Sequence, residues 1–171
     1  MLIPLLAGMA ATATAQVSGQ GPRAAVGRFF DHLKAGEYDR LYDQLPTQIQ
    51  QKASKEQTVE SLKRLGSFLV MDRMQVGRIQ QRGDFAVIDT TVYGRLKRPM
   101  QIQGEEVVEG RVLVQQYLLK EGREWRVITA DDRTRGFFLR SNPDFTRGFQ
   151  LSSPEFAFKR NGAWQSLGAR P

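Results

Sequence analysis

The chain has 171 residues, of which 40% are hydrophobic, and a formal net charge of +7 at pH 7. It contains no cysteine and a single histidine, His32. This composition excludes thiol nucleophiles, disulfides, cysteine-ligated metals and any site that needs two imidazoles. No nucleotide-binding, zinc-protease or serine-hydrolase motif occurs, so we expect no metal and no cofactor. His32 lies in an amphipathic segment, where a helix-end or surface position is the simplest interpretation.

The first 15 residues are uncharged and largely apolar, and they end in the small residues Ala13-Thr14-Ala15. Such a stretch is too short to span a bilayer and is typical of a cleavable signal peptide. We therefore expect a signal over residues 1–15 and a mature protein that starts at Gln16 and is soluble in a periplasm or outside the cell. A buried apolar helix is the alternative. No later segment is long and apolar enough to predict a transmembrane helix.

Residues 16–21 are polar and predict a loose leader before the folded domain. Pro22 suits a first helical turn. The next apolar residues follow the i, i+3, i+4, i+7 spacing of one helical face, and Gly36 is placed to end that helix. These residues are Val26, Phe29, Phe30 and Leu33.

Two further helices are predicted. Residues 38–45 repeat the same apolar spacing and stop at Pro46. Ser54-Lys55-Glu56-Gln57 has the form of a capping box, which predicts a helix that begins at Ser54 and ends at Gly66.

After Phe68 the apolar period changes to two, which predicts strands. The expected strands cover residues 74–79, either regular or with a bulge, 85–93, 107–119 and 124–130. Turns are expected at residues 81–84 and at Glu121-Gly122. Residues 95–103 are basic and contain Pro99, which favours a loop or an edge strand.

Helices followed by an antiparallel meander predict an α+β domain, with N-terminal helices packed on a curved sheet. We expect the sheet to curl around the first helix and to bury Phe29, Phe30 and Leu33 on its concave side.

Three segments carry a family resemblance: AAVGRFFDHLKAGEYDRLYDQL, SKEQTVESLKRLG and VLVQQYLLKEGREWRVI. Their order, over residues 22–132, resembles the nuclear transport factor 2-like superfamily, which has a cystatin-like cone fold. The resemblance implies a fold with a pocket under the first helix, and no particular activity.

Enzymes of that superfamily use a placed Asp or His in the pocket, usually with a tyrosine or a second acid as the donor to an oxyanion. Here Asp89 is the weak catalytic candidate, with Tyr93 or Tyr42 as donor, and the predicted ligand-binding residues are Tyr42, Asp89, Tyr93 and Gln116. This requires that Asp89 face the cone. The opposite face of the same strand, with Ala86, Ile88, Thr90 and Val92, is equally suited to a core, and Asp89 is then solvated.

The leading functional hypothesis is an exported, non-catalytic binding module. Its partner is a small apolar or amphipathic ligand, or a protein, and a homodimer through the sheet is one form of the latter. One alternative is a cofactor-independent lyase, isomerase or cyclase that uses Asp89 as base. Another is a structural accessory protein of an envelope or secretion assembly. Export makes nucleic acid a poor partner, despite the basic charge.

Residues 133–171 form a basic and aromatic extension, with seven basic residues against two acidic ones and six phenylalanines. This content is too apolar for a disordered tail. Asn161-Gly162, between two alternating segments, predicts a β-hairpin. Because a hairpin alone is marginally stable, we expect the extension to dock on the domain through its phenylalanines and to leave a basic rim.

Overall fold

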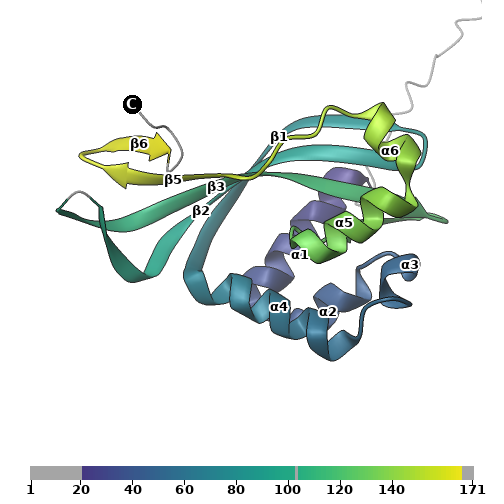
Figure 1. Cartoon of the computed structure of the whole chain (residues 1–171), viewed down its shortest axis with the longest axis horizontal. Coiled ribbons are helices and arrows are strands. Elements are labelled where there is room, and N and C mark those ends of the chain that lie inside the picture. Colours follow the sequence, from purple (N-terminus) through teal and green to yellow (C-terminus); the bar gives the residue numbers. More distant parts are fainter. Residues whose placement is uncertain (1–20, 103, 167–171) are drawn as a thin grey trace, which may run out of the picture.

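The computed structural model describes residues 21–102 and 104–166 (Figure 1). The predicted signal peptide, its cleavage site and residues 16–20 of the leader lie outside the described residues. The helices are α1 (Pro22–Ala35), α2 (Tyr38–Asp43), α3 (Thr47–Gln50), α4 (Lys55–Phe68), α5 (Asp132–Ser141) and α6 (Pro143–Gly148). The strands are β1 (Leu69–Arg82), β2 (Phe85–Ile102), β3 (Glu105–Glu121), β4 (Glu124–Ile128), β5 (Glu155–Arg160) and β6 (Ala163–Ser166).

Local sequence signals set the ends of the first helices. Pro22 is the first residue of α1, and Gly36 follows its last turn in the left-handed conformation, with φ 72°. The Ser54 side chain accepts a hydrogen bond from the Gln57 N–H and caps α4. These three predictions are confirmed, and α3 is an additional short helix after Pro46.

The prediction that α4 ends at Gly66 is wrong, because the helix continues to Phe68. Gly66 allows Tyr38 of α2 to pack against α4 and does not end the helix. A Cβ atom at Gly66 would lie 2.5 Å from the Tyr38 hydroxyl, which is closer than real contacts allow. The glycine thus lets α2 approach α4 closely.

The strands form one antiparallel sheet in the order β1-β2-β3-β5-β6, and it curls strongly (Figure 1). The long strand β3 has two partners on the same edge. Its residues 110–113 pair with β5, and its residues 117–121 pair with β4. The β1–β2 ladder shifts register between Val76 and Ile79, where a bulge was expected.

Residues 95–102 are part of β2, so the loop interpretation of this segment is wrong. β2 is an interior strand, and only its residues 97–102, which have no partner in β1, are edge-like. Pairing with β3 is interrupted between Arg95 and Met100. Pro99, which has no N–H to donate, falls within that interruption.

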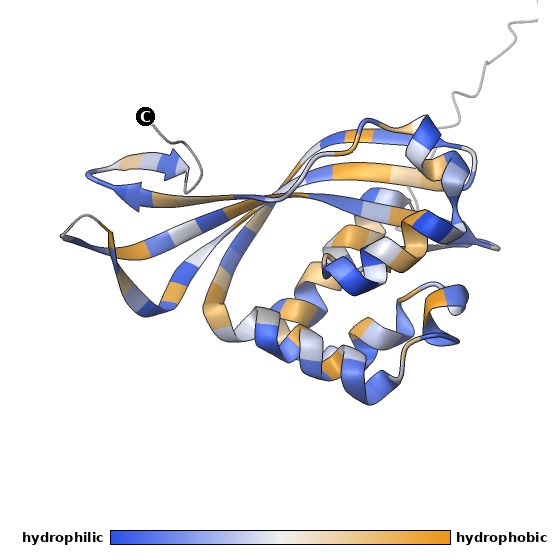
Figure 2. Ribbon diagram, in the orientation of Figure 1, coloured by the Kyte–Doolittle hydropathy of each residue, from blue (hydrophilic) through white to orange (hydrophobic). Residues whose placement is uncertain are grey.

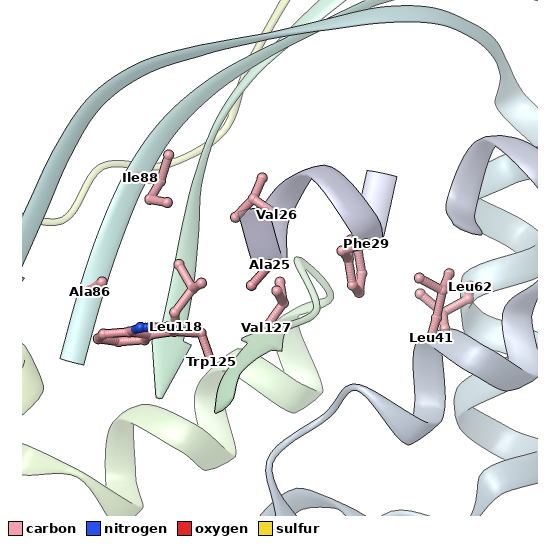
Figure 3. Close-up of a cluster of buried hydrophobic side chains, with 10 residues drawn as sticks. All are labelled: Ala25, Val26, Phe29, Leu41, Leu62, Ala86, Ile88, Leu118, Trp125 and Val127. Carbon is pink, nitrogen blue, oxygen red and sulfur yellow. The ribbon is translucent and has the colours of Figure 1, made fainter. Parts of the chain in front are cut away.

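The sheet packs on both faces, and hydrophobic residues alternate with hydrophilic ones along its strands (Figure 2). We call the face against α1 the inner face. There, Ala25, Val26 and Phe29 of α1 meet side chains of β2, β3 and β4 in one buried cluster (Figure 3). The strand residues of this cluster are Ala86, Ile88, Leu118, Trp125 and Val127. Phe30 is buried and Leu33 is partly buried, so the expected α1 face is the packed one.

The opposite, outer face is covered at one end by α5 and α6, two helices that the sequence pattern had not indicated. Phe138 of α5 and Phe145 of α6 are fully buried against Val87 and Tyr117 of the sheet. Asp131 caps α5 by accepting the Thr134 N–H, and Pro143 opens α6. Residues 132–149 therefore supply a second core layer.

Arg135 ties α5 to the outer face through a polar contact within this layer. Its guanidinium donates to the Gln115 carbonyl and stacks over the Tyr117 ring, 4.3 Å from the centroid. Burial lowers the pKa of Arg135, and the Tyr117, Asp131 and Asp132 charges oppose that shift.

The C-terminal strands form the predicted hairpin, which turns at Asn161 (φ 48°) and Gly162 (φ 77°). Positive φ at both central residues is the geometry that Asn-Gly favours. β5 adds to the edge of β3, and Phe158 joins Leu69, Leu96 and Val107 in a third buried cluster. The hairpin is thus part of the main sheet.

Glu105 connects the hairpin turn to the start of β3 through hydrogen bonds. Its carboxylate accepts from Arg160 Nε at 3.1 Å and from Asn161 Nδ2 at 3.3 Å. These hydrogen bonds hold the pKa of Glu105 below its ordinary value of 4.5. A lowered folded-state pKa stabilises the fold above the ordinary value, and this contribution is lost as the pH falls through the folded-state value.

We therefore expect acid to loosen the hairpin in the wild type, in a step below pH 4.5 that is absent from Glu105→Gln. Tryptophan fluorescence recorded against pH measures this, because Trp164 lies in β6 of the hairpin. The other tryptophan, Trp125, lies in β4, so comparison of the two proteins isolates the change at the hairpin. Superimposable pH profiles of the two proteins would contradict the assignment.

Candidate functional site

A large cavity lies between α1, α4 and the inner face of β2 and β3, which is where the sequence predicted a pocket. Its volume is about 610 Å³. The sheet side is a row of valines, and the helices close the opposite side. The apolar wall consists of Phe29, Leu33, Leu62, Phe68, Leu69, Met71, Val92, Val112, Val114, Ala130, Pro154 and Phe156.

The local sequence explains why this region is apolar and hollow. Side chains alternate along strands, so Val92 on β2 and Val112 and Val114 on β3 all point inward. Their side chains are short, and they line the cavity together with residues of α1 and α4, next to the packed cluster around Ala25 and Ile88. An apolar hollow results, with strand residues as its floor.

The polar residues of the cavity wall are Ser61, Arg64, Thr129, Asp131 and Gln116. Of these, Thr129 and Gln116 are buried, and Gln116 has 8% of its surface exposed. Its Nε2 donates to Thr90 Oγ1 at 3.1 Å, and Thr90 Oγ1 in turn donates to the Val114 carbonyl at 2.7 Å. This chain of bonds fixes the amide with its oxygen as the remaining acceptor. Among the described residues, none donates to Gln116 Oε1, so a ligand hydroxyl or amine can do so.

Asp131 lies at another point of the wall, but its carboxylate is already used. Oδ1 accepts the Thr134 N–H at 2.9 Å, and Oδ2 accepts the Thr129 hydroxyl at 2.6 Å. Both bonds serve the start of α5. We therefore assign Asp131 a structural role in holding the wall, because a helix N-terminus favours a negative charge.

Two phenylalanines mark the mouth of the cavity. Phe68, at the end of α4, is 51% exposed, and Phe156, on β5, is 47% exposed. Both also line the cavity. Large apolar side chains at a solvent-facing rim favour the entry of an apolar molecule.

The structure places the four predicted ligand-binding residues at three separate locations. Gln116 alone lines the cavity under α1. The Tyr42 hydroxyl donates to the carbonyls of Gln50 and Ala53, at 3.0 and 3.2 Å, and so fixes the segment after α2. Asp89 and Tyr93 point to the outer face of β2.

Of the two orientations left open for Asp89, the structure shows the outward one, so the catalytic and ligand-binding interpretation of this residue in the cone is not supported. Asp89 Oδ2 lies 3.4 Å from Arg78 Nε, and Oδ1 accepts from Gln115 Nε2 at 3.1 Å. The Tyr93 hydroxyl donates to Gln75 Oε1 at 2.8 Å. Because Ala86 and Ile88 take the inner positions of β2, strand alternation turns Asp89 outward. Neither candidate tyrosine hydroxyl is hydrogen-bonded to Asp89, so the proposed acid–base pair is not assembled.

The outer face holds a second, more polar hollow of about 400 Å³ next to Asp89. Gln115 occupies its floor and is internally satisfied, because it donates to Asp89 and accepts the Ser152 N–H at 2.9 Å. Further along this face, Arg73 stacks on the Tyr93 ring and Arg111 on Trp164. These contacts join β1, β2, β3 and β6 and explain the position of Tyr93.

Across residues 21–102 and 104–166, no three acidic or histidine side chains gather in a way that could hold a metal ion. In the same residues, no helix is long and apolar enough to cross a membrane.

The sequence was compared with protein families and with curated proteins. No protein-family model matches the sequence, and no curated protein matches it at a significant level.

Proposed function

We propose that the chain is a non-catalytic binding module that holds a small apolar or amphipathic molecule in the cavity between α1, α4 and the inner sheet face. The observation that supports this most directly is the cavity itself. Its volume of about 610 Å³ falls within the roughly 300–1,000 Å³ typical of ligand pockets. A largely apolar wall with a few polar groups, among them the free acceptor Gln116 Oε1, is the usual arrangement of such sites.

Two further proposals accompany the first. The curled sheet wrapped on α1 supports membership of the nuclear transport factor 2-like superfamily, whose resemblance the three sequence segments carry. The apolar segment 1–15 supports export, which places the binding site outside the cytoplasm. Asp89 takes no part in this function, because it lies on the other face of the sheet.

Filling the cavity tests the proposal. We expect Val114→Trp to weaken the binding of an apolar fluorophore, N-phenyl-1-naphthylamine, by at least about tenfold, because the indole occupies the site. A fluorescence titration gives the dissociation constant. Thermal melting shows whether the variant is folded.

The matched control is Val108→Trp. Val108 is on the same strand, is 44% exposed and does not line the cavity. The control is expected to bind the fluorophore as the wild type does. No saturable binding by the wild type, or unchanged binding by a folded Val114→Trp, would refute the proposal.

A further inference from the structure

A small hollow opens between α3, α4 and α5 and carries a concentration of positive charge. Its volume is about 210 Å³. Lys52, Arg133 and Arg140 lie in its wall, over an apolar floor that includes Ile49 and Phe137. Lys52 follows α3 in the chain, whereas the two arginines lie seven residues, or about two turns, apart on α5. Three cations from two separate segments therefore surround one space.

These cations have no acidic partner among the residues that the structure describes. None of the three belongs to an ion pair with a described carboxylate. Arg133 Nη1 donates to Gln57 Oε1 at 3.2 Å, which holds its guanidinium at the hollow. The one acid in the wall, Asp131, has both oxygens engaged by Thr134 and Thr129. The hollow is therefore a site of positive potential that attracts an anion.

The hollow and the large cavity are adjacent. Ser61 of α4 and Asp131 at the start of α5 line both of them. The apolar cavity and the basic hollow thus share part of their walls. A molecule that extends past Ser61 and Asp131 reaches an apolar environment at one end and positive charge at the other.

We propose that the ligand is an amphipathic anion, with its apolar body in the cavity and a carboxylate or phosphate head between Lys52, Arg133 and Arg140. This inference rests on the proposed function. The arginines suit such a head because their planar guanidinium groups match the geometry of both anions. The wall of the hollow holds three cations against one carboxylate, Asp131, so its formal charge remains positive and attracts an anion.

Three ligands that share a ten-carbon chain and differ in the head group test this proposal: decanoate, decyl phosphate and 1-decanol. Each is measured by its displacement of N-phenyl-1-naphthylamine. We expect both anions to displace the fluorophore at concentrations about tenfold lower than the alcohol, with a difference that shrinks as salt is added. In Lys52→Gln/Arg133→Gln/Arg140→Gln, the anions should lose this advantage and the alcohol should bind as before.

The control variant, Lys97→Gln/Arg98→Gln/Arg123→Gln, removes the same net charge from exposed positions outside the hollow. It should keep the preference for anions. Equal displacement by decanoate, decyl phosphate and decanol in the wild type would overturn the anionic head and leave the apolar site intact. Loss of the preference in the control variant would also overturn it. A fluorophore that does not bind at all would overturn the proposed function instead.

Discussion

Phe145→Ala is expected to lower the free energy of unfolding by about 3–5 kcal/mol, the usual range for a buried phenylalanine. Phe145 is fully buried and lies at the centre of an aromatic cluster. Its ring centroid is 4.9 Å from those of Phe138 and Phe149, 5.1 Å from that of Tyr117 and 5.6 Å from that of Phe85. Alanine would leave a cavity that these rings cannot fill, because they are fixed on α5, β2, β3 and the residue after α6.

Urea unfolding at equilibrium measures this loss. Phe156→Ala is the matched control, because that ring is 47% exposed and its removal should cost less than about 1 kcal/mol. If α5 and α6 were only loosely attached, Phe145→Ala would cost no more than the control. A loss similar to that of Phe156→Ala would therefore show that the second core layer does not stabilise the sheet.

The sequence predicts the local features of this fold well, because each depends on a few adjacent residues. Gly36, the Ser54 cap and the Asn161-Gly162 turn all lie where the backbone needs them. Period-two apolar patterns also predict the strands and their antiparallel order. Such signals require no knowledge of distant contacts.

The features that were missed depend on contacts between distant segments. The phenylalanines of residues 132–149 indicate an apolar surface, but the helical form of α5 and α6 is set by their packing on the outer face. The Asp131-to-Thr134 cap was the local signal that could have revealed α5. Gly66 looks like a helix end, yet it is required by the approach of Tyr38.

The position of the candidate site under the first helix was expected, but only one of its predicted residues, Gln116, lines it. For Asp89, both faces of β2 carry core-like residues, and only the docking of α1 against Ala86 and Ile88 decides which face is inner. The basic hollow joins Lys52 to Arg133 and Arg140, and nothing in the sequence indicates that these segments meet.

The second large loss of stability is expected at Gly94, where β2 pairs with β1. Gly94→Ala should lower the free energy of unfolding by about 1–3 kcal/mol, the usual cost of overpacking. A Cβ atom at Gly94 would overlap the Val70 carbonyl oxygen and lie 2.8 Å from Leu69 Cγ. The Val70 atom at this contact is its backbone oxygen, which cannot rotate away as a side chain can, so β1 must move away from β2. Because Leu69, Met71 and Val92 line the cavity, fluorophore binding should weaken as well.

A glycine-to-alanine substitution at Gly27 provides the control, because it should change the free energy of unfolding in the opposite direction. Gly27 lies inside α1, and a Cβ atom there would meet nothing within 4 Å. Alanine is the better helix former, so Gly27→Ala should raise the free energy of unfolding by about 0.5–1 kcal/mol. Urea unfolding of the two variants separates the effect of space from that of chain entropy, which is similar for both. Equal stability of Gly94→Ala and the wild type would mean that β1 and β2 are not held as closely at Gly94 as the structure places them.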